Sequence, residues 1–434
     1  MKYLGQSGGH LIKISKDPDN WILALVFLTP AFFLVVKSVA TTSLFLVFFI
    51  SCWAIFKEPR KYFVKRGAQF WVMVVCLLSP FLAEFLAQLG RGDLIASSLD
   101  GPSRAILAAA AFVYFSRKEC KHLVSALSIG SGVGIALLFL YLQVFPEYYW
   151  GNRAATHFVD PITLPCYTVV LMGLYLYGDS SRIPTRVSDF VKPLIFVKPL
   201  IFVITVYIAI ESQSRSSWVA AMVSITVYLL YSFKASLMKQ ILAMLVLVLG
   251  VFVIFNFSDV FRGRSLEAYE GLVTFFEVGG GQATSAGQRM ILLLIDFELV
   301  KENFFFGVAD GVMPSFEYLK ALVPSLNAEI YEIKTLAGSH SEMSGQLVRK
   351  GFFLGTFVLW GFFVYPLYLI ISGYMAQKFI SGTSQKLLGL VVPVLISGLT
   401  IQVFNLKMTM SFYVLSLAIF FACYHREHEL IKSE

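Results

Sequence analysis

The sequence predicts an all-α polytopic membrane protein with about twelve transmembrane helices and one large extracytoplasmic segment that contains helices. Of its 434 residues, 57% are hydrophobic and only 14% are charged, and the mean hydropathy is +0.73. An average soluble domain carries about 25% charged residues. Apolar runs of bilayer-spanning length recur from one end of the chain to the other, and such runs bury their surface in lipid. These observations argue against a soluble globular fold.

The apolar runs define twelve predicted spans, of which 103–115 is short and is expected to tilt or extend into its flanks. The spans are 21–36, 39–56, 69–89, 103–115, 123–145, 162–178, 194–211, 217–233, 240–257, 351–371, 387–403 and 408–423. The chain therefore divides into residues 1–257 with nine spans, a long segment at 258–350, and residues 351–434 with three spans and a tail.

The distribution of lysine and arginine predicts the orientation. Loops on one side, together with both termini, hold 21 of these residues, whereas the short loops on the other side hold 6. Cytoplasmic loops carry the excess of positive charge, and long loops are discounted because they cross regardless of charge. Both termini are therefore predicted to be cytoplasmic and 258–350 extracytoplasmic. The net charge of +8 follows from these loops, so no nucleic-acid partner is expected.

The long segment contains two predicted helices, one near 286–302 and one after Ser339. A connection of this length in a compact protein is usually functional or disordered, and the apolar periodicity favours function. Ser339 and Glu342 have the spacing of a capping box, which predicts that His340 occupies the first helical position. The positive end of the helix dipole would keep its imidazole neutral, as a general base requires. The alternative is a histidine with a structural hydrogen bond.

Three arginines mark the predicted extracytoplasmic side. Arg215 lies at a helix junction, Arg153 in a short loop and Arg289 in the long segment. An arginine at the membrane surface suits bidentate phosphate binding, and Ser214 and Ser216 could add hydrogen bonds. The alternatives are interfacial arginines that reach lipid headgroups and, for Arg289, a solvated helix face.

Two further residues are weaker candidates, and metal or nucleotide chemistry has little support. Glu84 is an intramembrane carboxylate, which is a functional hypothesis by default, although a structural role is equally compatible with its place near the end of a span. His157 could contact substrate. The sequence contains no H-E-x-x-H, Walker or G-x-G-x-x-G motif, so no metal site and no cofactor are expected.

Four motifs in this order resemble the O-antigen ligase and polymerase superfamily. They are Asn152-Arg153 through Asp160-Pro161, Ser214-Arg215 after a span, SAGQR at 285–289 with NFFFG at 303–307, and His340 at the start of a helix that leads to Gly351. The pattern covers roughly the last two-thirds of the chain. Many relatives have His-Asn where this chain has His340-Ser341.

This resemblance implies a GT-C-like glycosyltransferase of the bacterial inner membrane, with its active site facing the periplasm. The donor would be O-antigen on undecaprenyl pyrophosphate, and the acceptor a sugar hydroxyl of lipid A–core, in contact with membrane lipids. Arg215 and Arg289 would bind the pyrophosphate and His340 would act as the base. Arg153, Ser214, Ser216 and His157 would contact substrate, and the reaction would invert the anomeric carbon without a metal.

Two alternatives remain open at this point. A polymerase of the same superfamily would extend the glycan instead of attaching it to lipid A–core. A transporter or flippase of lipid-linked glycans would place its charged residues deep in the spans, around a central cavity. The glycan, the acceptor sugar and the oligomeric state do not follow from the sequence.

Overall fold

The structure is a computed structural model, and its described residues form helices and no strands. It describes residues 18–63, 66–118, 120–146, 150–178, 198–233, 236–278, 285–309, 312–375 and 382–433. The N-terminal tail at 1–17 and most of the basic loop at 179–198, on which the orientation partly depends, lie outside the described residues. The start of the predicted span at 194–211 does so as well.

Helices account for every predicted span. In the first half of the chain they are α2 (Pro18–Phe32), α3 (Val39–Lys57), α4 (Pro59–Phe63), α5 (Ala68–Arg91), α6 (Ala96–Phe115), α7 (Cys120–Val144), α8 (Thr163–Leu176), α10 (Lys198–Glu211), α11 (Arg215–Ser232) and α12 (Leu237–Phe257). In the second half they are α13 (Asp259–Val278), α14 (Ser285–Glu302), α15 (Phe316–Leu322), α16 (Ala328–Ala337), α17 (Glu342–Leu359), the π-helical turn η3 (Trp360–Val364), α18 (Tyr365–Met375), α19 (Gly382–Gly398) and α20 (Lys407–Ser433).

Six helical stretches in the described part of the chain are long and apolar enough to cross a membrane. They are Val39–Lys57, Ala68–Arg91, Lys121–Val144, Leu237–Phe257, Glu342–Gly373 and Lys407–Leu430. The helices at Thr163–Leu176, Arg215–Leu230 and Thr383–Gly398 are apolar but shorter. A multi-pass, all-helical membrane protein is therefore confirmed, whereas the number of twelve spans stays a prediction.

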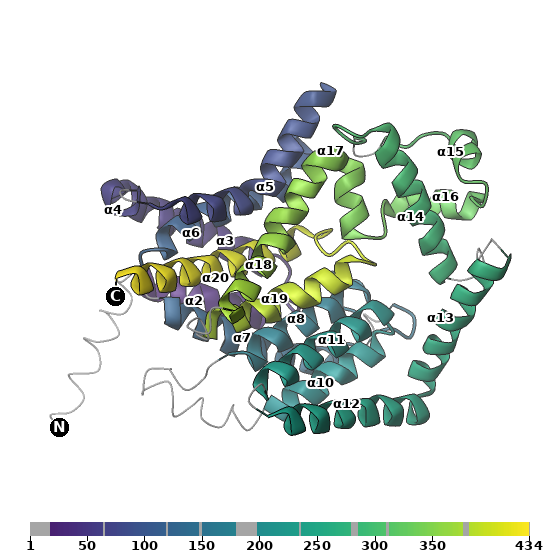
Figure 1. The fold of residues 1–434 in the computed structure, drawn as a ribbon, viewed down its shortest axis with the longest axis horizontal. Coiled ribbons are helices and arrows are strands. Elements are labelled where there is room, and N and C mark those ends of the chain that lie inside the picture. The colour runs from purple at the N-terminus through teal and green to yellow at the C-terminus, as the bar shows by residue number, and fades with distance from the viewer. Residues whose placement is uncertain are drawn as a thin grey trace.

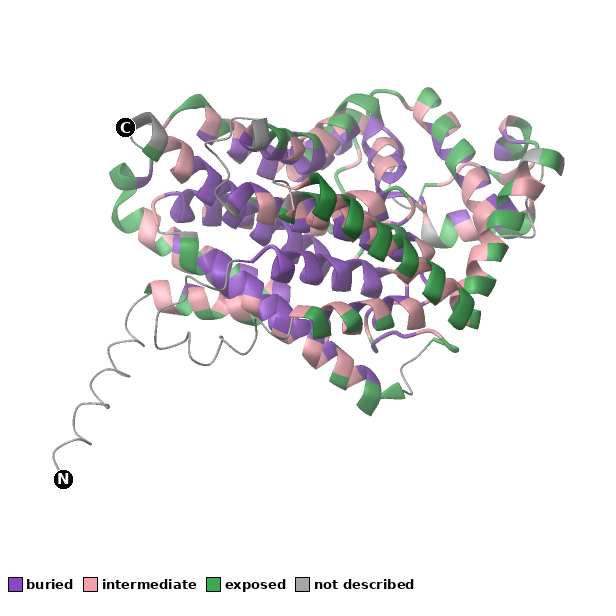
Figure 2. Cartoon of the chain, turned by 60° about the horizontal axis from the view of Figure 1, so that its bottom comes forward, coloured by how far each residue is buried: buried purple, intermediate pink, exposed green. Residues whose placement is uncertain are grey.

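The apolar core lies in the middle of this helical bundle. Every residue of α8 is buried, and α8 packs against α7, α10, α11 and α19. Figure 2 shows the buried residues gathered at the centre and the exposed ones at the periphery. At the edge of the bundle, α12 contains no buried residue, as expected for a helix whose apolar side chains face lipid.

After α12 and α13, the chain forms a second unit with its own apolar core, which we call the loop module (residues 285–341). In Figure 1, α13 rises from the end of α12 towards α14, α15 and α16. Leu292, Leu299, Leu319 and Ile330 are among the buried residues that pack together there. The predicted helix near 286–302 is confirmed as α14, and α13, α15 and α16 are additional.

Two glycines join the loop module to the bundle. Gly307 and Gly351 both have positive φ, 68° and 78°, which L-residues with a side chain rarely adopt. A Cβ on Gly307 would lie 2.4 Å from the carbonyl oxygen of Val348, and a Cβ on Gly351 would lie 2.4 Å from the carbonyl carbon of Phe305. The NFFFG turn and the kink in α17 therefore pack backbone against backbone, which explains a glycine at each place.

Candidate active site

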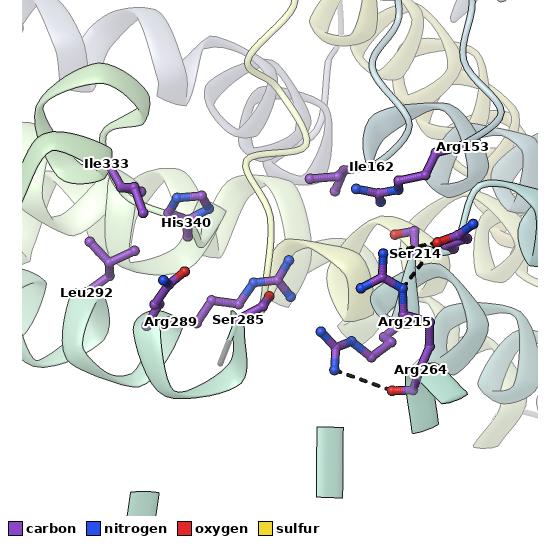
Figure 3. Close-up of a pocket in the computed structure, with 12 residues that line it drawn as sticks. Arg153, Ile162, Ser214, Arg215, Arg264, Ser285, Arg289, Leu292, Ile333 and His340 are labelled. Carbon is purple, nitrogen blue, oxygen red and sulfur yellow. Dashed lines mark hydrogen bonds between the residues drawn. The ribbon is translucent and has the colours of Figure 1, made fainter. Parts of the chain in front are cut away.

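A polar cavity of about 200 Å³ lies between the end of the bundle and the loop module. Its described lining includes four arginines, one histidine and no carboxylate: Arg153, Ile162, Gln213, Ser214, Arg215, Arg264, Ser285, Gln288, Arg289, Leu292, Ile333 and His340. Figure 3 shows His340 and Arg289 on one side, with Arg153, Arg215 and Arg264 opposite. The structure thus brings together Arg215, Arg289, His340, Arg153 and Ser214, which the sequence analysis had singled out separately.

On the bundle side, backbone and acidic partners hold the arginines in place. The Arg153 Nε donates to the Ser212 carbonyl oxygen at 2.9 Å. Arg215 is the first residue of α11, where its Nη2 lies 3.6 Å from Glu267 Oε1 and its Nη1 donates to the Arg264 carbonyl oxygen at 3.4 Å. Burial and the charge of Arg264 lower the pKa of Arg153, against the opposing effect of Asp160.

Arg264 is a cavity residue that the sequence analysis missed. It lies on α13, where its Nη1 is 2.9 Å from Glu267 Oε2, and its Nη2 donates to Gln213 Oε1 at 3.0 Å. Nothing local distinguishes it from Arg262, its neighbour on the same helix, whose side chain pairs with Asp259 at 2.5 Å and is 46% exposed. Only the docking of α13 beside the start of α11 brings Arg264 to the cavity.

Arg289 enters the cavity from the loop module, and no acidic or carbonyl partner holds it among the described residues. Burial and the charges of Arg215 and Arg153 lower the pKa of its guanidinium. Guanidinium groups that crowd together without a carboxylate between them repel one another. A bound anion would relieve that repulsion.

Two helices also begin at this cavity. Ser285 and Arg289 belong to the first turns of α14, and Arg215 begins α11 directly after Ser214. Backbone N–H groups and the helix dipole make such ends favourable for phosphate. The arginines and the two helix ends therefore favour the same kind of ligand, a multiply charged anion.

The capping box predicted for His340 is wrong. The N-cap of α17 is Ser341, whose hydroxyl accepts a hydrogen bond from the Ser344 N–H at 3.4 Å, and His340 precedes the helix instead of occupying its first position. The Ser339 hydroxyl instead donates to Asp296 Oδ1 at 2.9 Å and accepts from Lys334 Nζ at 3.0 Å. Tertiary contacts with Asp296 and Lys334 thus hold the serine that the local pattern predicted as the N-cap of the helix.

The surroundings of His340 favour its neutral form. Burial, then the charges of Arg289 and Lys334, lower its pKa below the ordinary value, and Asp296 opposes them. Its Nε2 atom is buried and has no hydrogen-bond partner in the described part of the chain. Buried polar atoms normally have a partner, so this ring nitrogen is available to a ligand hydroxyl.

The remaining candidates lie outside the described lining of the cavity. Ser216 is buried behind Ser214, with the two hydroxyl oxygens 3.1 Å apart. His157 Nδ1 lies 2.9 Å from the Tyr141 hydroxyl. Glu84 forms a buried ion pair with Lys350 of α17 at 2.9 Å. This contact gives Glu84 a structural role, because it ties α5 to the helix that follows His340.

A large apolar groove begins about one helical turn from the arginines. Its volume is about 880 Å³, and it runs between α10, α11 and α12. Trp218, three residues after Arg215, and Phe261, three residues before Arg264, lie at one end, and Lys198 and Lys239 lie at the other. A cavity lined by arginines thus adjoins an apolar groove.

The described residues form no metal site, and the region that contains most of the cavity residues matches a known protein family. No group of three or more His, Cys, Asp or Glu side chains in the described ranges is placed to hold a metal ion. The model of the family described as O-antigen ligase matches residues 200–359, which include Arg215, Arg264, Arg289 and His340. The earlier motif at 152–161 lies outside this match. No curated protein matches the chain.

Proposed function

We propose that this chain, with its O-antigen ligase family region, is a glycosyltransferase of the bacterial inner membrane. It would transfer O-antigen from undecaprenyl pyrophosphate to a sugar hydroxyl of lipid A–core on the periplasmic face. The observation that carries the proposal is a cavity beside an apolar groove, in which four arginines meet a histidine whose Nε2 has no hydrogen-bond partner among the described residues. A lipid-linked glycosyl pyrophosphate has the matching parts: a polyanion next to a long hydrocarbon chain.

The arginines would bind the donor and stabilise its departure. As the bond between the anomeric carbon and the pyrophosphate oxygen breaks, the electron pair passes to the pyrophosphate, and negative charge grows there. Preorganised cations aimed at growing charge lower the barrier. Arg289 and Arg215 face the cavity from opposite sides, so they can hold the diphosphate between them. Arg153 and Arg264 would add further charge.

His340 would remove the proton from the acceptor. The acceptor oxygen attacks the anomeric carbon, its proton passes to the imidazole, and undecaprenyl pyrophosphate leaves from the opposite face with inversion. The pKa of His340, lowered by burial and by Arg289, keeps the ring neutral at pH 7, which a general base needs. The residues present supply these roles without a further group, and the pyrophosphate bond supplies the driving force.

The arrangement favours a transferase over a transporter of the same lipid-linked glycan. A transporter would place its cations along a path through the bundle, whereas here the arginines gather at one end, at the junction with the loop module. We favour ligation over polymerisation because the matching family is the O-antigen ligase family. The orientation with both termini in the cytoplasm would put this junction in the periplasm.

The test is transfer by the purified full-length protein in detergent micelles. The donor is undecaprenyl-pyrophosphate oligosaccharide, and the acceptor is lipid A–core. We expect ligated lipopolysaccharide and released undecaprenyl pyrophosphate. A protein that binds the donor but forms no product with this acceptor would disprove ligation. Lipopolysaccharide from a deletion strain separates the family alternatives, because loss of a polymerase leaves a single repeat attached, whereas loss of a ligase removes every capped form.

A further inference from the structure

Behind the candidate base lies a buried ion pair that the proposed mechanism does not use. Asp296 of α14 and Lys334 of α16 are in direct contact, and their side chains are only 2% and 3% exposed. Taking two charges out of water costs several kcal/mol per ion. A hydrophobic pair of similar volume is often as stable, so the position of the pair suggests a role besides stability.

The pair is bonded to the residue that precedes His340. The Ser339 hydroxyl donates to Asp296 Oδ1 at 2.9 Å, and Lys334 Nζ donates to the same hydroxyl oxygen at 3.0 Å. The Gln402 side chain also donates to the Ser339 carbonyl oxygen. Ser339 therefore has its hydroxyl and its carbonyl both held, which restricts the backbone next to the histidine.

The same carboxylate also holds the residues on the other side of His340. Its Oδ2 accepts a hydrogen bond from Ser344 at 2.5 Å, and Ser344 lies in the first turn of α17. Ser341 in turn donates to the Gly398 carbonyl oxygen at 3.1 Å. The segment 339–344 is thus bonded to Asp296 at both ends, with His340 between them.

Asp296 also connects the position of His340 to that of Arg289, because Asp296 and Arg289 lie on the same helix. It lies seven residues after Arg289 on α14, which is two helical turns, so both side chains lie on one face of the helix. The hydrogen bonds that Asp296 accepts from Ser339 and Ser344 therefore connect the position of His340 to that of Arg289.

We propose that Asp296 and Lys334, acting through Ser339 and Ser344, are positioning residues that hold His340 in register with Arg289 for proton transfer. This inference rests on the proposed function. Two features make the role one of placement. The pair does not line the cavity. Its two charges act on the pKa of His340 in opposite directions, so the effect of one offsets part of the effect of the other.

The experiment uses two variants that weaken the tether without leaving a buried charge unpaired. The double variant Asp296→Asn/Lys334→Met replaces both charges, and Ser339→Ala removes one hydroxyl and leaves the ion pair intact. The matched control is Glu298→Gln/Lys301→Met, which removes a partly exposed ion pair of 2.8 Å from the same helix. The protein is the full chain in detergent micelles, labelled with ¹⁵N-histidine, and the His340 signal is assigned by its loss in His340→Gln.

We expect kcat for glycan transfer to fall about 10- to 100-fold in both tether variants, since a misplacement of about 1 Å can cost a hundredfold. The KM for the donor should change less than about threefold, because the bundle-side arginines still bind it. The His340 signal should broaden or split, while its titration midpoint stays near the wild-type value. The charged groups that act on this ring are Arg289, Lys334 and Asp296. The control should match the wild type throughout.

Wild-type kcat together with a single sharp His340 signal in Ser339→Ala would overturn the proposal, even if the double variant fails to fold. A large shift of the titration midpoint in the double variant would also overturn it, because the pair would then act on basicity. If the wild-type protein transfers no glycan, the proposed function fails. The His340 signal would still report whether the tether places the ring.

Discussion

The two sides of the cavity are held in different ways. On the bundle side, Arg215 shares Glu267 with Arg264, and Arg153 bonds to the Ser212 carbonyl. On the loop-module side, Arg289 has no acidic partner among the described residues, and His340 Nε2 has no hydrogen bond there. Protein groups thus already compensate the positive charge of the bundle-side arginines. On the loop-module side, Arg289 and His340 Nε2 remain available to a ligand. We therefore expect the loop-module residues to contribute more to the rate.

The largest effect is expected for the base. His340→Ala should lower kcat about 10²- to 10⁴-fold, the usual contribution of general base catalysis, while binding of the donor is retained. Transfer kinetics with the purified protein measure this loss. His122→Ala, which changes an exposed histidine at the start of α7, is the matched control. A His340→Ala enzyme within threefold of the wild type would show that another group takes the proton.

The two central arginines provide the direct comparison between the two sides. Arg289→Ala should lower kcat about 10²- to 10³-fold, as loss of a donor to growing negative charge does. Arg215→Ala should cost only about tenfold, because Glu267 already offsets part of its charge and Arg264 stays nearby. Arg262→Ala, an arginine of α13 outside the cavity lining, is the control. A larger loss for Arg215 than for Arg289 would reverse the comparison.

The pH profile tests the state of His340. Its pKa is lowered, so the neutral ring predominates at pH 7 and is lost only when the pH falls through a value below the ordinary one of about 6.5. We expect kcat to be flat near neutrality and to fall tenfold per pH unit at lower pH. Arg289→Ala removes a neighbouring cation, so it should move this limb to higher pH. An unmoved limb would assign the titration to another group.

The smallest effect is expected for substitution of Glu267, because its carboxylate offsets part of the positive charge of the bundle-side arginines. Glu267→Gln frees Arg215 and Arg264 from their shared carboxylate, so inorganic pyrophosphate should bind about two- to fivefold more tightly. This range corresponds to a partly exposed ion pair of up to about 1 kcal/mol. Isothermal titration calorimetry measures the change, with Glu270→Gln on the same helix as the control. Weaker binding would mean that Glu267 orients the arginines.

The match between sequence and structure is closest where the signal is local. Apolar runs predicted helices at all twelve positions, because the backbone of a segment in lipid must satisfy its own hydrogen bonds. The helix near 286–302 followed from the apolar periodicity alone. The capping box at Ser339 failed, because the helix begins after Ser341 and the Ser339 hydroxyl is bonded instead to Asp296, more than forty residues earlier in the chain, and to Lys334. Arg264 was missed because only the docking of α13 distinguishes it from Arg262.

Composition and hydrophobic run length were sufficient to identify a helical membrane protein, and the polar motifs, by their residue types and by their resemblance to a known family, singled out Arg215, Arg289 and His340. These properties belong to short stretches of chain, and local physics decides them. That the three residues surround one cavity, that Arg264 joins them, and that a buried ion pair lies behind the histidine were decided by tertiary packing. Such relations depend on distances between segments far apart in the chain, and no local pattern contains them.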